Sequence, residues 1–393
     1  MMRKFKFCSI VLFFITIGYG QNNKSKTADF ILPNVLKTID GDTVTTVSLW
    51  EKKRRPEIFT MFANNIYGQA LKNYDDIKFT VTTDVANAIN GKAHLKEVTI
   101  TVWKSKKSLD IHLTLFTPNN SKKQSPAFLL IDNGKKNNTD VFGMSKNDRR
   151  TAEMVVDSGY AFAVVYTGNA APDNKETYQN GVLQLYPDQI TADNGIKAIG
   201  AWAWAASRAM DYFETDNDID FTKVGVVGHS RGGKTALWAG AQDQRFAIVF
   251  SSCSGSTGAA LARNQSGETV KAINTGFPHW FNNNYKKYNY NVNALPVDQH
   301  MLISLIAPRP VYTTSATQDL WADPVGSYLS LVNAQKVYAL YGKHSALTPD
   351  QPPPNTPIIN SVLGYHIREG GHDLAAYDWG IFIRFANVNY FQK

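Results

Sequence analysis

Cysteine is almost absent from this sequence of 393 residues, which contains only Cys8 and Cys253. Cys8 lies in an N-terminal segment that we expect to be cleaved off, so the mature chain keeps one thiol and forms no internal disulfide. The chain also lacks an apolar run of the roughly 20 residues that a membrane-spanning helix needs. Its stability must therefore come from a packed core, for which a hydrophobic content of 43% is sufficient.

Clusters of like charge are also missing. The chain has 41 Lys and Arg against 33 Asp and Glu, but the basic residues are scattered along it and form no stripe. This distribution is typical of a solvated surface and argues against a nucleic-acid partner. A charged fraction of 19% likewise argues against a disordered chain.

Residues 1–20 have the three parts of a secretory signal peptide. The basic residues Arg3, Lys4 and Lys6 precede an apolar run over residues 8–17, and Gly20 supplies a small residue before the cleavage point. Removal of these three basic residues lowers the net charge from +8 to +5. We expect an exported protein, periplasmic or extracellular, without a membrane anchor after cleavage, and a monomer.

Apolar strands alternate with helical segments over residues 91–393, which predicts one catalytic domain with a mostly parallel central sheet and helices on both faces. Residues 21–90, helix-prone at 47–53 and 63–73, are expected to form an N-terminal lead-in that packs on this domain. The expected strands are 97–103 and 109–116 as a hairpin, 127–134, 160–166, 224–228, 247–251, 310–315 and 337–341. The expected helices are 149–157, 196–212, 235–242 and 379–391, and long loops or insertions are expected at 167–194, 255–300 and 342–357.

The stretch Gly228-His229-Ser230-Arg231-Gly232 joins an apolar strand to a helical segment. In that context, the G-x-S-x-G pattern predicts a nucleophile elbow, with Ser230 held on a tight turn above the sheet. The alternative is a glycine turn with an idle serine. The elbow predicts an α/β-hydrolase fold, on which the chain order is serine, then acid, then histidine.

Of the residues after Ser230, two aspartates are candidates for the acid and two histidines are candidates for the base. His372, in the glycine loop before the last helix, is the predicted base, whereas His366 fits a packed histidine better. Asp319, directly after the strand 310–315, is the predicted acid. Asp323 is the alternative acid, although its place before a proline also suits a helix cap.

Two cations stand beside the predicted nucleophile. The backbone amide of Arg231 is placed to stabilise an oxyanion, and its guanidinium adds positive charge. Lys234 lies one helical turn after Ser230. Because cations are disfavoured at a helix N-terminus, the pair indicates an anionic or polyhydroxylated ligand, or the oxyanion itself.

Several motifs together resemble the bacterial glucuronoyl esterases, carbohydrate esterase family 15. They run in order from about residue 95 to the C-terminus: 228–234 (GHSRGGK), 267–270 (GETV), 277–281 (FPHWF), 295–300 (LPVDQH), 307–310 (APRP), 319–324 (DLWADP) and 370–373 (GGHD). The resemblance implies an α/β-hydrolase that uses no metal or cofactor. Its substrate would be the ester between 4-O-methyl-glucuronic acid of xylan and lignin alcohols.

The resemblance also implies roles for single residues. It makes Ser230 the nucleophile, Arg231 the oxyanion arginine and His372 the base. It makes Lys234 a contact of the uronate, Glu268 a contact of the sugar hydroxyls and Trp321 a substrate-facing side chain.

One departure from the family pattern concerns the acid. Many members carry a Glu shortly after the strand that follows the elbow helix, where this chain has Cys253, which we expect to be a small packed residue. Asp319 matches the alternative position of the acid. Two other functions stay open: an acetyl-xylan or other carbohydrate esterase, and a non-catalytic carbohydrate-binding hydrolase fold.

Overall fold

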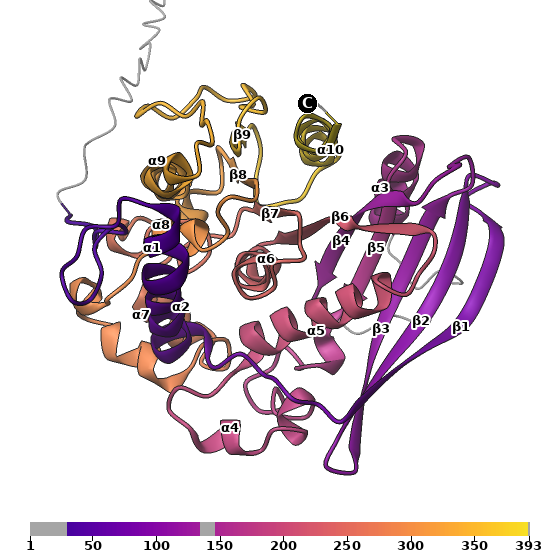
Figure 1. Cartoon of the computed structure of the whole chain (residues 1–393), viewed down its shortest axis with the longest axis horizontal. Helices are drawn as coiled ribbons and strands as arrows, with labels where there is room; N and C mark the ends of the chain where they lie inside the picture. The colour runs from indigo at the N-terminus through magenta and orange to yellow at the C-terminus, as the bar shows by residue number, and fades with distance from the viewer. Residues whose placement is uncertain (1–29, 134–145, 392–393) are drawn as a thin grey trace, which may run out of the picture.

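The computed structural model describes residues 30–133 and 146–391, so the predicted signal peptide lies outside the described residues (Figure 1). Within them, the strands are β1 Asp76–Ala88, β2 Ala93–Lys104, β3 Lys107–Pro118, β4 Ser125–Asp132, β5 Ala161–Tyr166, β6 Ile219–His229, β7 Ile248–Ser252, β8 Val311–Ala316 and β9 Leu363–Arg368. The helices are α1 Val47–Leu49, α2 Arg55–Phe62, α3 Lys146–Asp157, α4 Asp188–Thr191, α5 Ala198–Phe213, α6 Arg231–Gln242, α7 Val270–Gly276, α8 Gln299–Ser304, α9 Pro324–Leu340 and α10 Ala376–Phe391. None of these helices combines the length and the apolar character of a bilayer span.

The strands form one sheet in the order β1-β2-β3-β5-β4-β6-β7-β8-β9. Strands β1, β2, β3 and β5 pair antiparallel, and every pair from β5 through β9 is parallel. The predicted hairpin is β2–β3, and it turns at Ser105 and Lys106, which both have positive φ. The prediction of a mostly parallel α/β-hydrolase sheet is confirmed.

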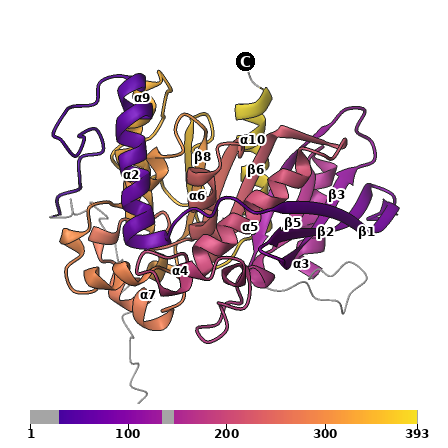
Figure 2. The same ribbon diagram turned by 60° about the horizontal axis from the view of Figure 1, so that its bottom comes forward.

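Helices cover both faces of the sheet, as predicted (Figures 1 and 2). Successive residues of a buried strand point to opposite faces, so neighbours enter different cores. Val226 packs in the core beneath α5 and α6, whereas Val227 packs in the core beneath α3 and α10. Trp202 and Trp204 of α5 are buried in the first of these cores.

The lead-in forms more structure than its composition suggests. Residues 47–67 are helical throughout, because a π-helix at Trp50–Arg54 joins α1 to α2 and a second at Ala63–Tyr67 follows α2. This helical segment lies beside α8, at the end of the sheet remote from β1 (Figures 1 and 2). Phe59 and Tyr67 stack on the buried Trp238 of α6 at 5.1 and 4.6 Å. The helix predicted over 63–73 ends at Tyr67 since Gly68 takes φ 90°.

Other elements also differ from the predictions, and β9, α7 and α8 were not predicted. The edge strand β1 was not predicted from its polar, exposed sequence. The predicted strand 337–341 is wrong, because this stretch is the end of α9. Leu331, Ala334, Val337 and Tyr338 are all buried at helical spacing, and four or five apolar residues read alone do not distinguish a helix from a strand.

Candidate active site

The predicted catalytic side chains lie at one edge of the sheet. Ser230 follows β6, Asp319 follows β8 and His372 follows β9. These strands are parallel, so their carboxyl ends meet at the same edge, which is where open α/β sheets bind ligands. Cys253, which follows β7, lies at this edge too.

Ser230 has the strained backbone of a nucleophile elbow, with φ 56° and ψ −122°. Its N–H donates to the carbonyl of Ser252 at 2.8 Å, and its own carbonyl accepts the N–H of Gly233. A side chain at Gly228 would place its Cβ 1.9 Å from the Gly232 carbonyl oxygen. The turn therefore closes only because Gly228 lacks a Cβ.

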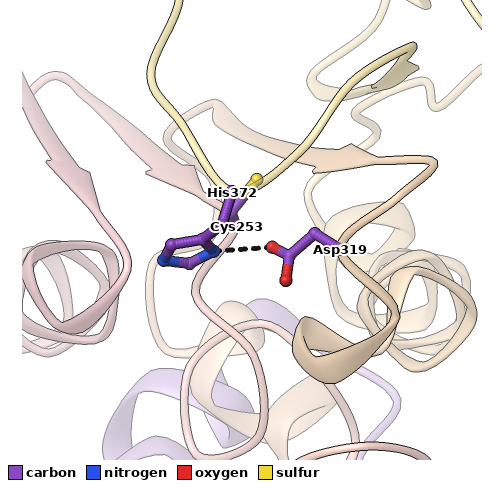
Figure 3. Close-up of side chains that lie close together, drawn as sticks. All are labelled: Cys253, Asp319 and His372. Atoms are coloured by element: carbon purple, nitrogen blue, oxygen red, sulfur yellow. Dashed lines mark hydrogen bonds and ion pairs between the residues drawn. The ribbon is translucent and has the colours of Figure 1, made fainter.

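His372 and Asp319 are in direct contact. His372 Nδ1 lies 2.7 Å from Asp319 Oδ2 (Figure 3). Burial would raise the pKa of the Asp319 carboxyl, but the hydrogen bond and charge of His372 keep it below its usual value. An ionised carboxylate at Nδ1 fixes the tautomer that leaves Nε2 as a proton acceptor. The His372 side chain is 43% exposed, so this nitrogen is accessible.

The hydrogen bond predicted between Ser230 and His372 is not formed. Among the described residues, none joins Ser230 Oγ to His372 Nε2. Such bonds are often long without substrate.

Asp323 has a different set of partners. One oxygen accepts the N–H of Gly326 at 2.9 Å and so caps α9, and the other accepts the amide of Asn264 at 2.7 Å. Burial raises the pKa of the Asp323 carboxyl. Of the two predicted acids, Asp319 is the one that contacts His372.

An arginine holds the loop of the predicted base. Arg368 Nη2 donates to the carbonyl oxygens of Gly371 and Asp373, one on each side of this histidine, at 2.9 and 2.6 Å. Arg368 Nε is held at 3.0 Å by Asp378, which also contacts His366 at 2.8 Å. His366 is fully buried in this second histidine–aspartate pair, as expected for a packed histidine.

His229 packs against the base from the elbow side, with ring centroids 4.6 Å apart. Burial and the charge of His372 lower the pKa of His229 to about 4. It therefore stays neutral and places no second cation beside the base.

The Arg231 side chain is held by Asp173, from the long loop 167–194. Its Nη1 pairs with Asp173 Oδ2, and its guanidinium lies over Trp280, with 5.2 Å from Cζ to the ring centroid. Asp173 Oδ1 accepts from His279 Nε2 and Trp280 Nε1, each at 2.8 Å. Burial would raise the pKa of Asp173, but these hydrogen bonds and the arginine charge lower it to about 2.

Lys234 and Glu268 form a buried ion pair. The distance from Nζ to Oε2 is 2.6 Å, and the residues are 2% and 8% exposed. Lys234 Nζ also donates to the Ser256 carbonyl, and burial lowers the pKa of the ammonium. The N–H of Glu268 donates to the carbonyl of Trp321 at 2.8 Å, and the Trp321 side chain is 59% exposed. The three predicted substrate residues are thus brought together.

Asp173 and Arg368 were not found by sequence reasoning. The sequence predicts a long loop at 167–194, but nothing in its Asn, Asp and Pro content distinguishes Asp173 from its neighbours. Arg368 carries no motif at all.

Comparisons with known proteins show which family the chain resembles. The family model "glucuronyl esterase, fungi" matches residues 100–342. A carbohydrate esterase of an unknown prokaryotic organism is 39% identical over 93% of this chain and 91% of its own length. The 4-O-methyl-glucuronoyl methylesterase 1 of Wolfiporia cocos is 33% identical over 46% of each chain.

Solved structures of glucuronoyl esterases are similar to this chain over nearly its whole length. A glucuronoyl esterase from Solibacter usitatus is 36% identical with a TM-score of 0.86, covering 94% of this chain and 100% of its own. A second, from Teredinibacter turnerae, is 29% identical with a TM-score of 0.82 and covers 91% of this chain and 88% of its own.

Proposed function

The chain belongs to the glucuronoyl esterase family, carbohydrate esterase family 15, and we propose that it cleaves the ester between (4-O-methyl-)glucuronic acid of xylan and lignin alcohols. As a member of that family it is a carboxylic ester hydrolase. The observation that carries the proposal is the 2.7 Å contact between His372 and Asp319, at the sheet edge that also bears the Ser230 elbow.

Acylation begins at Ser230. Its Oγ attacks the carbonyl carbon of the ester while His372 Nε2 takes the hydroxyl proton. The backbone N–H of Arg231 stabilises the oxyanion, and the guanidinium adds positive charge there. When the intermediate collapses, the C–O bond to the alcohol breaks and the alcohol leaves with the proton from His372. The uronoyl group is then esterified to Ser230.

Deacylation repeats these steps with water. His372 takes a proton from a water molecule, which attacks the acyl carbon, and returns the proton to Ser230 Oγ as the uronic acid leaves. Asp319 holds the ring throughout and stabilises the imidazolium that forms twice per turnover. The chemistry uses only these side chains and water.

The sugar is recognised beside this machinery. Glu268 accepts hydrogen bonds from sugar hydroxyls, and the Lys234 ammonium has one N–H left for the uronate after its two partners among the described residues. Trp321 offers an exposed ring to either side of the ester. Asp173 is a positioning residue, because it acts through the Arg231 guanidinium.

We also propose a location, an oligomeric state and a division into segments for the chain. Residues 1–20 are a signal peptide, the protein acts in the periplasm or outside the cell, and it works as a monomer. Residues 21–90 serve as the lead-in to the catalytic domain 91–393.

The test is hydrolysis of benzyl or methyl glucuronate by the mature chain and by Ser230→Ala. Loss of the nucleophile should lower kcat by at least about 10⁴-fold. Turnover by Ser230→Ala at the wild-type rate would refute the assignment.

A second comparison addresses the sugar. Glu268→Gln keeps the shape of the side chain but removes its charge. It should therefore lower the rate of hydrolysis of glucuronate esters and leave the hydrolysis of a small acetyl ester unchanged. Wild-type preference for the acetyl ester would instead favour an acetyl-xylan esterase. An unreactive Ser230 towards a fluorophosphonate would favour the non-catalytic fold.

A further inference from the structure

Three side chains of different chemistry lie close together: Cys253, Asp319 and His372 (Figure 3). One thiol sulfur, one carboxylate oxygen and one imidazole nitrogen all lie within 4.8 Å of one another. Cys253 is 3% exposed and has φ 44°, and the proposed reaction makes no use of its thiol.

We propose that these three side chains bind a thiophilic divalent cation such as Zn²⁺, and that the bound cation inhibits the enzyme. Thiolate, imidazole and carboxylate are the three side-chain ligands of zinc, and three protein ligands leave the fourth position to water. The His372 side chain is 43% exposed, so one of the three ligands contacts solvent. Donors on one tetrahedral zinc lie roughly 3.3–3.8 Å apart, so small side-chain rotations complete the site.

Binding removes the base by a change of tautomer. The cation takes the lone pair of His372 Nδ1, so the ring proton that Nδ1 donated to Asp319 moves to Nε2. The Cys253 thiol gives its proton to solvent. One proton is therefore released for each cation bound, and no group is oxidised or reduced. Nε2–H cannot accept the proton of Ser230, and attack on the ester stops. This consequence rests on the role of His372 in the proposed function.

Binding is tested without any substrate. Calorimetric titration of the mature chain with ZnCl₂ should give one site per chain, and Cys253→Ala should lower the zinc affinity at least about tenfold. Mutation of residues that only hydrogen-bond to metal ligands already lowers metal affinity by about 10–100-fold. Cys253→Ser provides a second variant of nearly unchanged volume. Equal affinity in wild type and both variants, or no binding by wild type, would overturn the site.

Inhibition is read as labelling of Ser230 by a fluorophosphonate. At a zinc concentration equal to the wild-type dissociation constant, zinc should slow labelling of wild type and a chelator should restore it. Cys253→Ala, which binds zinc at least about tenfold more weakly, should be slowed by no more than about 10% at that concentration. His94→Ala is the matched control, because it removes an exposed histidine–aspartate pair, with 2.6 Å between His94 Nε2 and Asp84 Oδ1, and should stay zinc-sensitive. Equal slowing in Cys253→Ala would refute the proposal. The enzyme could be labelled and respond to zinc as expected, yet fail to hydrolyse glucuronate esters. That result would refute the proposed substrate and leave the zinc site supported.

Discussion

Replacing each of two aspartates by asparagine tests which one orients the base. In Asp319→Asn the side chain keeps its shape but loses the charge that holds His372 Nδ1–H at 2.7 Å. The amide can donate to Nδ1, which favours the tautomer with its proton on Nε2. The ring then has no lone pair directed at Ser230, and the imidazolium of the reaction loses its counter-ion.

The size of the effect follows from that distance. Two unit charges 2.7 Å apart at an effective dielectric constant of 20 attract by about 6 kcal/mol. The corresponding substitution in serine proteases lowers kcat by about 10⁴. We expect a loss of about 10³–10⁴ in kcat, or about 4–5.5 kcal/mol in activation free energy, because each tenfold is 1.36 kcal/mol.

Asp323→Asn is the control four residues away. Asparagine caps helices as well as aspartate does and tolerates the left-handed backbone of this position, where φ is 49°. Its kcat/KM on benzyl glucuronate should stay within about twofold and its free energy of unfolding within about 1 kcal/mol. If Asp323→Asn lost activity while Asp319→Asn kept it, the assignment of the acid would be wrong.

Asp173 supports two further predictions. Asp173→Asn frees the Arg231 guanidinium, which is 40% exposed, to pair with the carboxylate product, so the inhibition constant of glucuronate should fall about 5–10-fold, as a partly exposed ion pair permits. An unchanged constant, or the same fall in the control Asp188→Asn at the exposed start of α4, would contradict this. The pKa of Asp173 is about 2 in the folded protein, below its ordinary 3.8, so its stabilisation is complete above about pH 4 and is lost as the pH falls towards 2. The difference in Tm between wild type and Asp173→Asn should shrink over that window, and a constant difference would assign the effect to packing.

The fold was largely predictable because most strands of its parallel sheet are apolar and are separated by clear turns or helical segments. The chain order of the hydrolase fold then placed the base in one loop and the acid in another. Failures came where local pattern is ambiguous. The end of α9 reads as a strand because Val337, Tyr338 and Tyr341 favour strands locally, while the cap and packing that make it helical lie elsewhere in the chain.

The finer geometry of the site depends on contacts between distant residues. Asp319 and Asp323 occupy one short loop, and only the position of the His372 loop decides which of them it meets. Asp173 meets Arg231 across 58 positions of sequence. No local pattern encodes such a contact, so the sequence predicted the long loop 167–194 and not the residue.

The ion pairs of Arg231 and Lys234 change the interpretation of these two cations beside Ser230. By sequence, Arg231 and Lys234 indicate an anionic ligand or an oxyanion. In the structure each already has a carboxylate partner, Asp173 for the first and Glu268 for the second. An esterase of uronates binds a neutral ester and must release a carboxylate. Cations that are already paired gain little from the product, whereas a transient oxyanion next to the Arg231 amide still gains from the preorganised donors. The pairing therefore favours the transition state over the product, which is what turnover on such an ester requires.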